Sequence, residues 1–211
     1  MFMSSEEQVG VYGLNMKIAA IAIFAAVIAA GAFYVWYFRL NASEQIMRED
    51  FEDGFGDWVI DADVPLDPNN PGHYIEWSIT RSTDVASSGQ YSLKFFIDGR
   101  QDDGTIWIER RIPVRKNAQI QVSISFDFYS EHESFNTIAA VCAYADVRKP
   151  EAEEHFAVIG NANEVGGWKR YEYTAKIDTS SSGEIWVALG ISVRWETYMT
   201  YFIDDVEVEI I

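Results

Sequence analysis

Few side chains in this sequence are spaced for catalysis or for binding a transition metal. His73, His132 and His155 lie far apart and form no His-x-x-x-His or cysteine-rich pattern, the usual ligand spacing of zinc sites. The sequence also contains no Gly-x-Ser-x-Gly elbow, phosphate-binding glycine loop or dinucleotide fingerprint, although sequence order alone leaves a Ser-His-Asp arrangement open. Two acidic clusters, 131–133 and 151–154, contain enough carboxylates for a glycosidase pair, but such runs are typical of solvated loops. We therefore predict that the protein is not an enzyme.

The charge of the chain excludes one class of partner. Its 33 acidic and 16 basic residues give a formal net charge of -17, which repels a phosphate backbone and leaves no basic stripe for nucleic acid. The only charges before residue 44 are Glu6, Glu7, Lys17 and Arg39, and they cancel. The rest of the chain therefore carries the whole negative charge. We interpret it as a solvated acidic surface, with a salty habitat or bound cations as the alternatives.

The single cysteine, Cys142, excludes an internal disulfide, so the folded part depends on its core, with or without help from a metal. Cys142 lies in the apolar stretch 138–144 with no histidine close in sequence. We interpret it as a small, unreactive core residue rather than a nucleophile.

An uncharged segment near the N-terminus is long enough to cross a membrane. Residues 18–38 contain no charge, and 21 helical residues match a bilayer core of roughly 30 Å. Lys17 and Arg39 bracket the segment, and an aromatic cluster typical of the headgroup region lies at its C-terminal end. We therefore predict an N-terminal transmembrane helix over 18–38, after a short tail over 1–17. The alternative is a cleaved signal peptide with a cleavage region near 29–32.

The segment 18–38 is too long and too aromatic at its end for a cleavable signal, which favours an uncleaved signal-anchor. A short N-terminal tail before a long C-terminal domain is the usual product of such an anchor. We therefore predict a single-pass membrane protein whose C-terminal domain is extracytoplasmic, with a polar stem over 39–48 and the domain over 49–211. The basic residues at the two ends of the segment hardly discriminate the orientation.

The domain has the alternating pattern of β-strands. Segments rich in Val, Ile, Phe, Tyr and Trp with period 2 recur about every ten residues between 74 and 210, separated by turn residues such as Ser88-Gly89 and Gly166-Gly167. Many short strands with this spacing predict an all-β fold, an antiparallel β-sandwich of the jelly-roll type.

The alternation also assigns faces, because successive side chains of a strand point to opposite sides of the sheet. Three strands, at 105–112, 120–129 and 184–195, each place isoleucine, valine or phenylalanine on one face. Their opposite faces carry aromatic and charged side chains, namely Trp107, Glu109, Arg111, Asp127, Tyr129, Trp186 and Arg194.

Five short motifs carry a family resemblance. They are Asp50-Phe51-Glu52-Asp53-Gly54, then Trp58, Ser87-Ser88-Gly89-Gln90-Tyr91-Ser92-Leu93, Gly167-Trp168 and Tyr201-Phe202-Ile203-Asp204-Asp205-Val206. In this order they resemble the carbohydrate-binding modules of the galactose-binding-like jelly-roll superfamily, which accompany xylanases and glucanases. The resemblance spans about 49–211 and implies a mostly extracellular setting. The same fold also serves adhesion and structural roles.

The resemblance implies a structural calcium ion that ties the first strand to the last. Glu52 and Asp204 occupy the positions of its carboxylate ligands, and carbonyl oxygens of 87–89 would supply others, since Ca²⁺ takes six to eight oxygen ligands. The alternative is that Glu52 and Asp204 are solvated or hydrogen-bonded ends of strands.

The resemblance also implies a glycan site of aromatic and polar side chains on one sheet. The seven outward residues have that composition, whereas the alternative is that Trp107 and Trp186 pack under loops or against the second sheet. We predict a non-catalytic module at the membrane surface that binds glycan or another extracellular polymer. The alternative is a structural or accessory subunit with protein partners, whose helix packs through the small residues of 22–31.

Overall fold

The computed structural model of the protein describes residues 27–31, 33 and 45–211. The chain divides into two compact units, Met1–Ser43 and Glu44–Ile211. In the first unit, residues 27–31 and 33 are helical, and within the described residues no helix has the length and apolar character needed to cross a membrane. The expected tail over 1–17, most of the expected anchor over 18–38 and the start of the expected stem lie outside the described residues.

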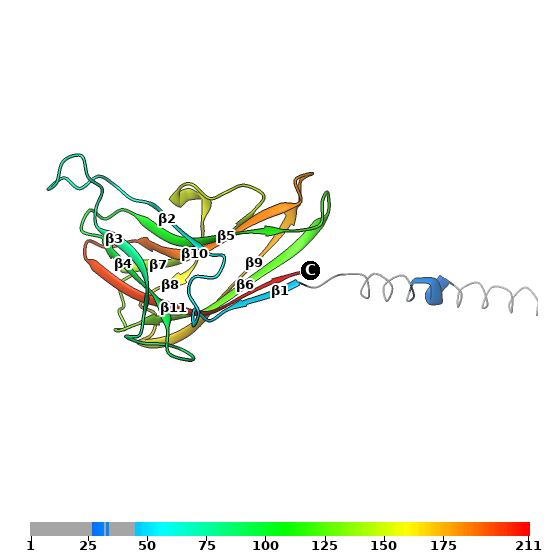
Figure 1. Ribbon diagram of the computed structural model, residues 1–211, viewed down its shortest axis with the longest axis horizontal. Helices are drawn as coiled ribbons and strands as arrows, with labels where there is room; N and C mark the ends of the chain where they lie inside the picture. The colour runs from blue at the N-terminus through cyan, green and yellow to red at the C-terminus, as the bar shows by residue number, and fades with distance from the viewer. Residues whose placement is uncertain (1–26, 32, 34–44) are drawn as a thin grey trace, which may run out of the picture. The chain divides into compact units, whose positions relative to one another are not determined.

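The second unit is a sandwich of two antiparallel sheets (Figure 1). The first sheet has the order β3-β4-β11-β6-β9, with β1 also paired to β11, and the second has the order β2-β5-β10-β7-β8. The strands of the first sheet are β1 (Gln45–Glu49), β3 (Trp77–Ser82), β4 (Ser92–Asp98), β6 (Gln119–Ser130), β9 (Gly167–Asp178) and β11 (Tyr198–Ile210). Those of the second are β2 (Val59–Asp63), β5 (Thr105–Pro113), β7 (Ala139–Asp146), β8 (Ala157–Asn161) and β10 (Glu184–Val193), and a short 3-10 helix η1 (Glu153–His155) precedes β8. The predicted all-β sandwich is thus confirmed.

The domain begins earlier than the sequence predicted. Strand β1 pairs with β11 from Gln45 opposite Ile210 to Glu49 opposite Val206. Residues 45–48, expected in the stem over 39–48, therefore belong to the first sheet. The physical reason is that the long strand β11 pairs with β4 along its first half only, so its second half has a free edge that β1 satisfies with backbone hydrogen bonds.

The core lies between the two sheets and follows the predicted alternation. On β6, Ile120, Val122, Ile124, Phe126 and Phe128 are all buried, while the residues between them lie on the outer face of the first sheet. Strands β5 and β10 contribute facing isoleucine, valine and leucine side chains from the second sheet. Cys142 is also buried, as predicted, and burial raises the pKa of its thiol well above the usual range.

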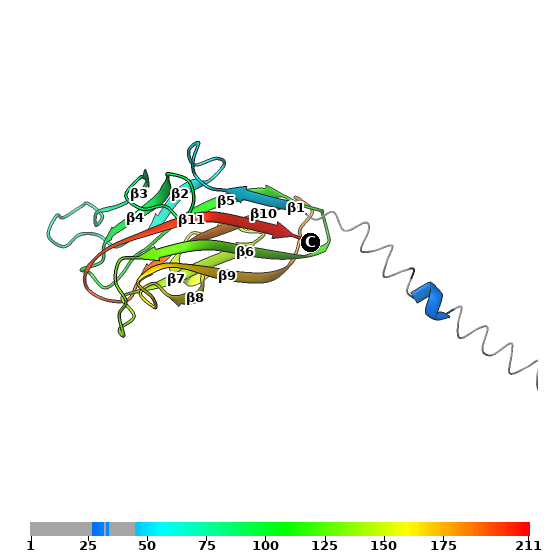
Figure 2. The ribbon, with the colours of Figure 1, turned by 90° about the horizontal axis from the view of Figure 1, so that it is seen from below.

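A loop over 147–156 covers part of the outer face of the second sheet, and we call it the strap. It connects β7 to β8 and contains η1. In Figure 1 it is the olive segment above β5 and β10. Figure 2 shows the opposite side of the sandwich, where β11, β6 and β9 of the first sheet run side by side.

Candidate functional site

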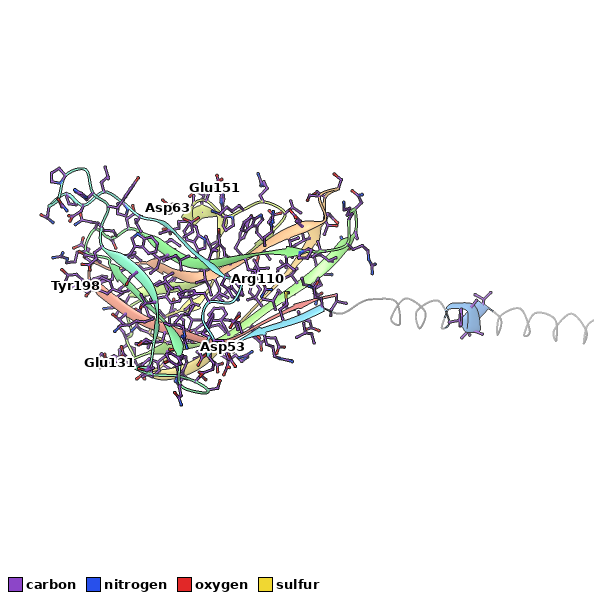
Figure 3. The ribbon with its side chains drawn as sticks, viewed as in Figure 1. Asp53, Asp63, Arg110, Glu131, Glu151 and Tyr198 are labelled. Atoms are coloured by element: carbon purple, nitrogen blue, oxygen red, sulfur yellow. The ribbon has the colours of Figure 1, made fainter. Side chains whose placement is uncertain are left out.

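The seven predicted site residues lie on two opposite faces of the sandwich. Asp127 and Tyr129 are on β6 of the first sheet. The others belong to the second sheet or follow it directly, namely Trp107, Glu109, Arg111, Trp186 and Arg194. In Figure 3, Glu131, which directly follows β6, and Glu151, in the strap, mark these two sides. The seven residues therefore do not form one groove. The alternation predicts whether a side chain faces the core or the solvent. It does not predict to which of the two sheets the strand belongs.

Trp107 is fully buried, contrary to its predicted place in an open groove. Its ring packs against Phe156 of the strap, with 5.0 Å between ring centroids, in a small second cluster with Tyr144 and Ala188. The alternative that this tryptophan packs under a loop is thus correct. Burying a large aromatic ring under the strap removes apolar surface from water.

Glu109 is also buried under the strap and is compensated by two neighbours. The indole nitrogen of Trp107 donates to Glu109 Oε2 at 3.0 Å, and Lys149 Nζ lies 3.1 Å from Glu109 Oε1. Lys149 also binds Asp61 at 2.7 Å, and this hydrogen bond raises the pKa of the lysine. Glu109 therefore fastens the strap to the sheet and is closed to an external ligand.

A second polar contact fastens the other end of the strap. Arg194 Nη1 binds Glu153 Oε1 at 2.6 Å and donates to Ser192 Oγ at 2.8 Å. The Thr105 hydroxyl lies 3.1 Å from Glu153 Oε2 and 2.9 Å from Ser192 Oγ, within hydrogen-bonding distance of both. Arg194 is therefore engaged inside the domain.

Trp186 and Arg111 remain at the rim of the strap. Trp186 is half-buried, with Lys149 Nζ 5.9 Å from its ring, and Arg111 is paired with Glu184 at 3.5 Å. A pocket of 590 Å³ lies nearby and is lined by Tyr144, Asp146, Arg148, Lys149, Glu151 and His155. Charged groups dominate this rim.

The first sheet presents a different arrangement. A straight row of side chains crosses it, with one residue from each of the strands β3, β4, β11, β6 and β9. The strand registers place Thr80 opposite Lys94, Lys94 opposite Phe202, Phe202 opposite Tyr129, and Tyr129 opposite Trp168. Each lies on the outer face of its strand, since the residues on either side of Phe202 and Tyr129 are buried on the inner face. We call Phe202, Tyr129 and Trp168 the aromatic row.

The rings of the aromatic row contact one another in sequence. The centroids of Tyr129 and Trp168 are 5.3 Å apart with their planes at 57°, and those of Tyr129 and Phe202 are 5.9 Å apart at 77°. Tyr129 and Trp168 are half-buried, whereas Phe202 is buried, with 8% of its surface exposed and Lys94 Nζ 5.8 Å from its ring. The mutually tilted rings hold each other in place, and Tyr129 and Trp168 keep part of their surface open to solvent.

A second aromatic pair lies on the same face, nearer the start of β11. Phe96 and Tyr198 stack with centroids 6.2 Å apart and planes at 16°, and Tyr198 is 54% exposed (Figure 3). The guanidinium of Arg100 lies 4.4 Å from the ring of Tyr198 and is fixed by Asp98. Apolar ring surface therefore continues from the aromatic row toward the end of the domain where β11 begins.

Polar groups border the aromatic row on its other side. Asp127, two residues before Tyr129, accepts hydrogen bonds from Arg170 Nη1 at 3.0 Å and from the hydroxyl of Ser87. Arg170 also donates to Ser125 Oγ. Beyond Arg170 lies a pocket of 370 Å³ whose lining residues are Arg48, Glu49, Asp50, Arg170, Asp205, Val206 and Glu207. The face thus combines rings with hydrogen-bonding side chains.

Sequence reasoning placed only Tyr129 and Asp127 on this face and missed Trp168, Phe202 and Lys94. Trp168 and Phe202 each stood within a motif of the family resemblance. The alternation around Trp168, with Tyr171, Tyr173 and Ile177 on the other face, was the signal that could have placed it outward.

The predicted calcium ligands accept hydrogen bonds from backbone amides. Asp204 Oδ2 accepts from the amides of Ser87 and Ser88, and Asp204 Oδ1 accepts from the amide of Asp205. Glu52 Oε1 accepts from the amides of Gln90 and Tyr91. Among the described residues, no group of three or more His, Cys, Asp or Glu side chains is placed to hold a metal. Burial raises the pKa of Asp204, although the three amides lower it in part.

Solved structures with a similar arrangement include carbohydrate-binding modules. TmCBM61, solved in complex with beta-1,4-galactotriose, is 14% identical at a TM-score of 0.45 and is matched over 75% of this chain and 92% of that chain. The CBM22-1 xylan-binding domain of Paenibacillus barcinonensis Xyn10C is 15% identical at a TM-score of 0.47, over 79% and 94%. A cleaved adhesin domain of Lys-gingipain from Porphyromonas gingivalis is 12% identical at a TM-score of 0.49, over 79% and 99%.

No family model and no curated protein matches the sequence. Carbohydrate-binding modules, which the sequence motifs resemble, are thus among the matched structures. Their identities and TM-scores assign no ligand, site or family to this chain.

Proposed function

We propose that this domain is a non-catalytic binding module that takes a glycan or another hydroxyl-rich surface polymer onto the aromatic row. The observation that carries the proposal is the register that aligns Phe202, Tyr129 and Trp168 across three neighbouring strands on the outer face of the sheet, where Tyr129 and Trp168 are partly exposed and Phe202 supports them from a buried position. Aromatic side chains repeated at strand spacing offer a ligand several contacts along one line.

The chemistry of the face suits a sugar chain. A pyranose ring has an apolar C–H side that packs on an aromatic ring, and its hydroxyl groups need hydrogen-bonding partners around that contact. Asp127, Arg170, Lys94 and Thr80 supply such partners next to the rings. An extended polymer also suits an open row better than a closed cavity, because no deep pocket is formed by the rings themselves.

The proposal places the module at a membrane surface outside the cytoplasm. This part rests on the uncharged segment 18–38 and on the usual topology of a signal-anchor. The described domain begins at Gln45, directly after the short polar segment that follows Arg39. A tethered module of this kind would hold a polymer close to the cell.

The test is a binding assay with the full-length chain in a mild detergent against a panel of insoluble and soluble polysaccharides. Trp168→Ala and Tyr129→Ala should each weaken the observed binding at least tenfold, about 1.4 kcal/mol. Trp186→Ala is the matched control, because this half-buried tryptophan lies on the opposite sheet. Absence of binding to every polysaccharide, or equal effects of the row and control variants, would sink the proposal.

An accessory-subunit role is the second candidate, and two exposed aromatic side chains favour it. Phe135 is fully exposed and Trp195 is 56% exposed, and their loops are joined by the hydrogen bond from the Arg194 amide to the Ile138 carbonyl. Exposed aromatic rings in adjacent loops are typical of protein contacts. Co-purification from native membranes in mild detergent, compared between wild type and the Phe135→Ser and Trp195→Ser double variant, distinguishes this role from glycan binding.

A further inference from the structure

The turn after β1 and the loop before β4 meet at β11, where the family resemblance implies calcium. The loop over 85–91 runs between two carboxylates, Glu52 on one side and Asp204 on the other. Asp204 is fully buried. A buried carboxylate needs compensation by a cation or by hydrogen-bond donors.

Backbone amides supply that compensation at Asp204. Its Oδ2 accepts from Ser87 N at 2.8 Å and from Ser88 N at 3.2 Å, and its Oδ1 accepts from Asp205 N at 2.8 Å. Three N–H dipoles therefore point at this carboxylate. Each N–H group directed at a carboxylate oxygen takes one of its lone-pair positions and places a positive partial charge where a cation would approach.

The second carboxylate is held in the same way. Glu52 Oε1 accepts from Gln90 N at 2.7 Å and from Tyr91 N at 2.8 Å. Gly89 makes this approach possible: its φ is +58°, and a Cβ added there would lie 2.4 Å from Glu52 Oε1 and 2.6 Å from Glu52 Cδ. The loop thus turns its amide edge, rather than its carbonyl edge, toward both carboxylates.

Calcium needs oxygen ligands that face a common point. Here three of the four carboxylate oxygens of Glu52 and Asp204 already accept amide N–H groups, two of them from the loop and one from Asp205 of β11. The residues present therefore do not fit the implied ion.

We infer that this junction is closed by an amide clamp, in which Glu52 and Asp204 bind the backbone of the loop directly, and that folding of the domain is independent of calcium. The clamp is independent of the proposed glycan binding. It also fixes Ser87, whose hydroxyl donates to Asp127 at the border of the aromatic row.

The test is thermal unfolding of the full-length chain in mild detergent, followed by circular dichroism, with EGTA and with millimolar Ca²⁺. The clamp predicts the same Tm in both conditions for the wild type. A rise of several degrees with Ca²⁺ would overturn it, because an ion that binds only the native state raises the midpoint.

Asp204→Asn separates the clamp from a metal site. It should lower the Tm in EGTA, and by the same amount in Ca²⁺, because it replaces an acceptor oxygen with a donor. At a calcium site this variant would match the wild type in EGTA and would lose only the Ca²⁺-dependent rise. Asp53→Asn, an exposed neighbour of Glu52, is the control and should change neither value.

Hydrogen exchange tests the clamp in the wild-type protein, without any variant. The clamp predicts that the amides of Ser87, Ser88, Gln90 and Tyr91 are protected in EGTA, in a peptide covering 85–92. Protection that requires Ca²⁺ would contradict the inference.

Discussion

The ring of Phe156 lies against the ring of Trp107, with 5.0 Å between their centroids and 54° between their planes. This contact joins the strap to the centre of the outer face of the second sheet. Trp107 is fully buried there, so the centre of the face that has most of the predicted site residues is closed. The first sheet keeps its outer face open, which is why the candidate site lies there.

The strap should depend on this aromatic contact. Phe156→Ala should destabilise the domain by less than the about 3–5 kcal/mol lost at a fully buried phenylalanine, since Phe156 is half-buried. It should also expose Trp107 to water, which shifts its fluorescence emission to longer wavelength. Urea unfolding followed by fluorescence measures both effects. Phe135→Ala, at a fully exposed phenylalanine, is the control; an equal loss of stability in both variants would show that the contact is unimportant.

The buried carboxylate under the strap should make Lys149 important for stability. Lys149→Met leaves Glu109, which is 1% exposed, with only the indole N–H of Trp107 as a partner. The expected loss is about 1–3 kcal/mol, toward the lower value because water can reach the half-exposed site of the lysine. Lys176→Met, an exposed lysine on β9, should change the denaturant midpoint little. A Lys149→Met variant as stable as the control would mean that Glu109 gains no stabilisation from the ion pair.

Cys142 should be inert in the folded protein. Its thiol is buried on the outer face of β7, near Glu153 and Arg194, and burial raises its pKa, so thiolate is scarce at neutral pH. A maleimide reagent at pH 8 should therefore label the native chain much more slowly than the chain in guanidinium chloride, where the same single thiol reacts. Equal labelling rates in the two states would show that β7 opens freely.

Much of the fold could be predicted because the alternation on β6 and β10 is unbroken. Those strands have side chains of one kind on the core face over their whole length, so both their existence and their inward residues follow from period 2. Strands β1 and β2 escaped prediction for the opposite reason. Each is five residues long, and β2 has both Val59 and Ile60 exposed at the edge of its sheet, so no alternation marks it.

The site could be predicted only in part because it depends on pairing across the chain. Tyr129 and Asp127 were placed outward by local alternation, but their neighbours Trp168 and Phe202 come from strands far along the sequence. The burial of Trp107 depends on Phe156, 49 residues later, in a loop with no periodic pattern. Local patterns give the face of a side chain, and only the sheet order decides which faces join and which are covered.

Stability should fall on the alkaline side, and Tyr144 should account for part of the fall. Burial raises the pKa of Tyr144 to about 12 from the ordinary value of 10.0, and the nearby charge of Asp146 acts in the same direction. Between pH 10 and 12 the unfolded chain loses this phenol proton while the folded domain keeps it. The unfolded state therefore binds fewer protons, and the free energy of unfolding decreases as the pH rises through this range.

Tyr144→Phe tests this assignment. At neutral pH the variant loses the hydrogen bond from the Tyr144 hydroxyl to the Arg148 carbonyl, 2.8 Å, and should be less stable by about 1 kcal/mol. Between pH 10 and 12, however, its stability should fall less steeply than that of the wild type, because the phenylalanine has no proton to lose. Lys149, whose pKa is also raised, contributes a fall of the same sign in both proteins and so cancels in the comparison. Urea unfolding at pH 7, 10, 11 and 12 measures the slopes, with Tyr74→Phe as the control at an exposed tyrosine. Parallel slopes for the wild type and Tyr144→Phe would show that the folded domain gives up this proton as readily as the unfolded chain.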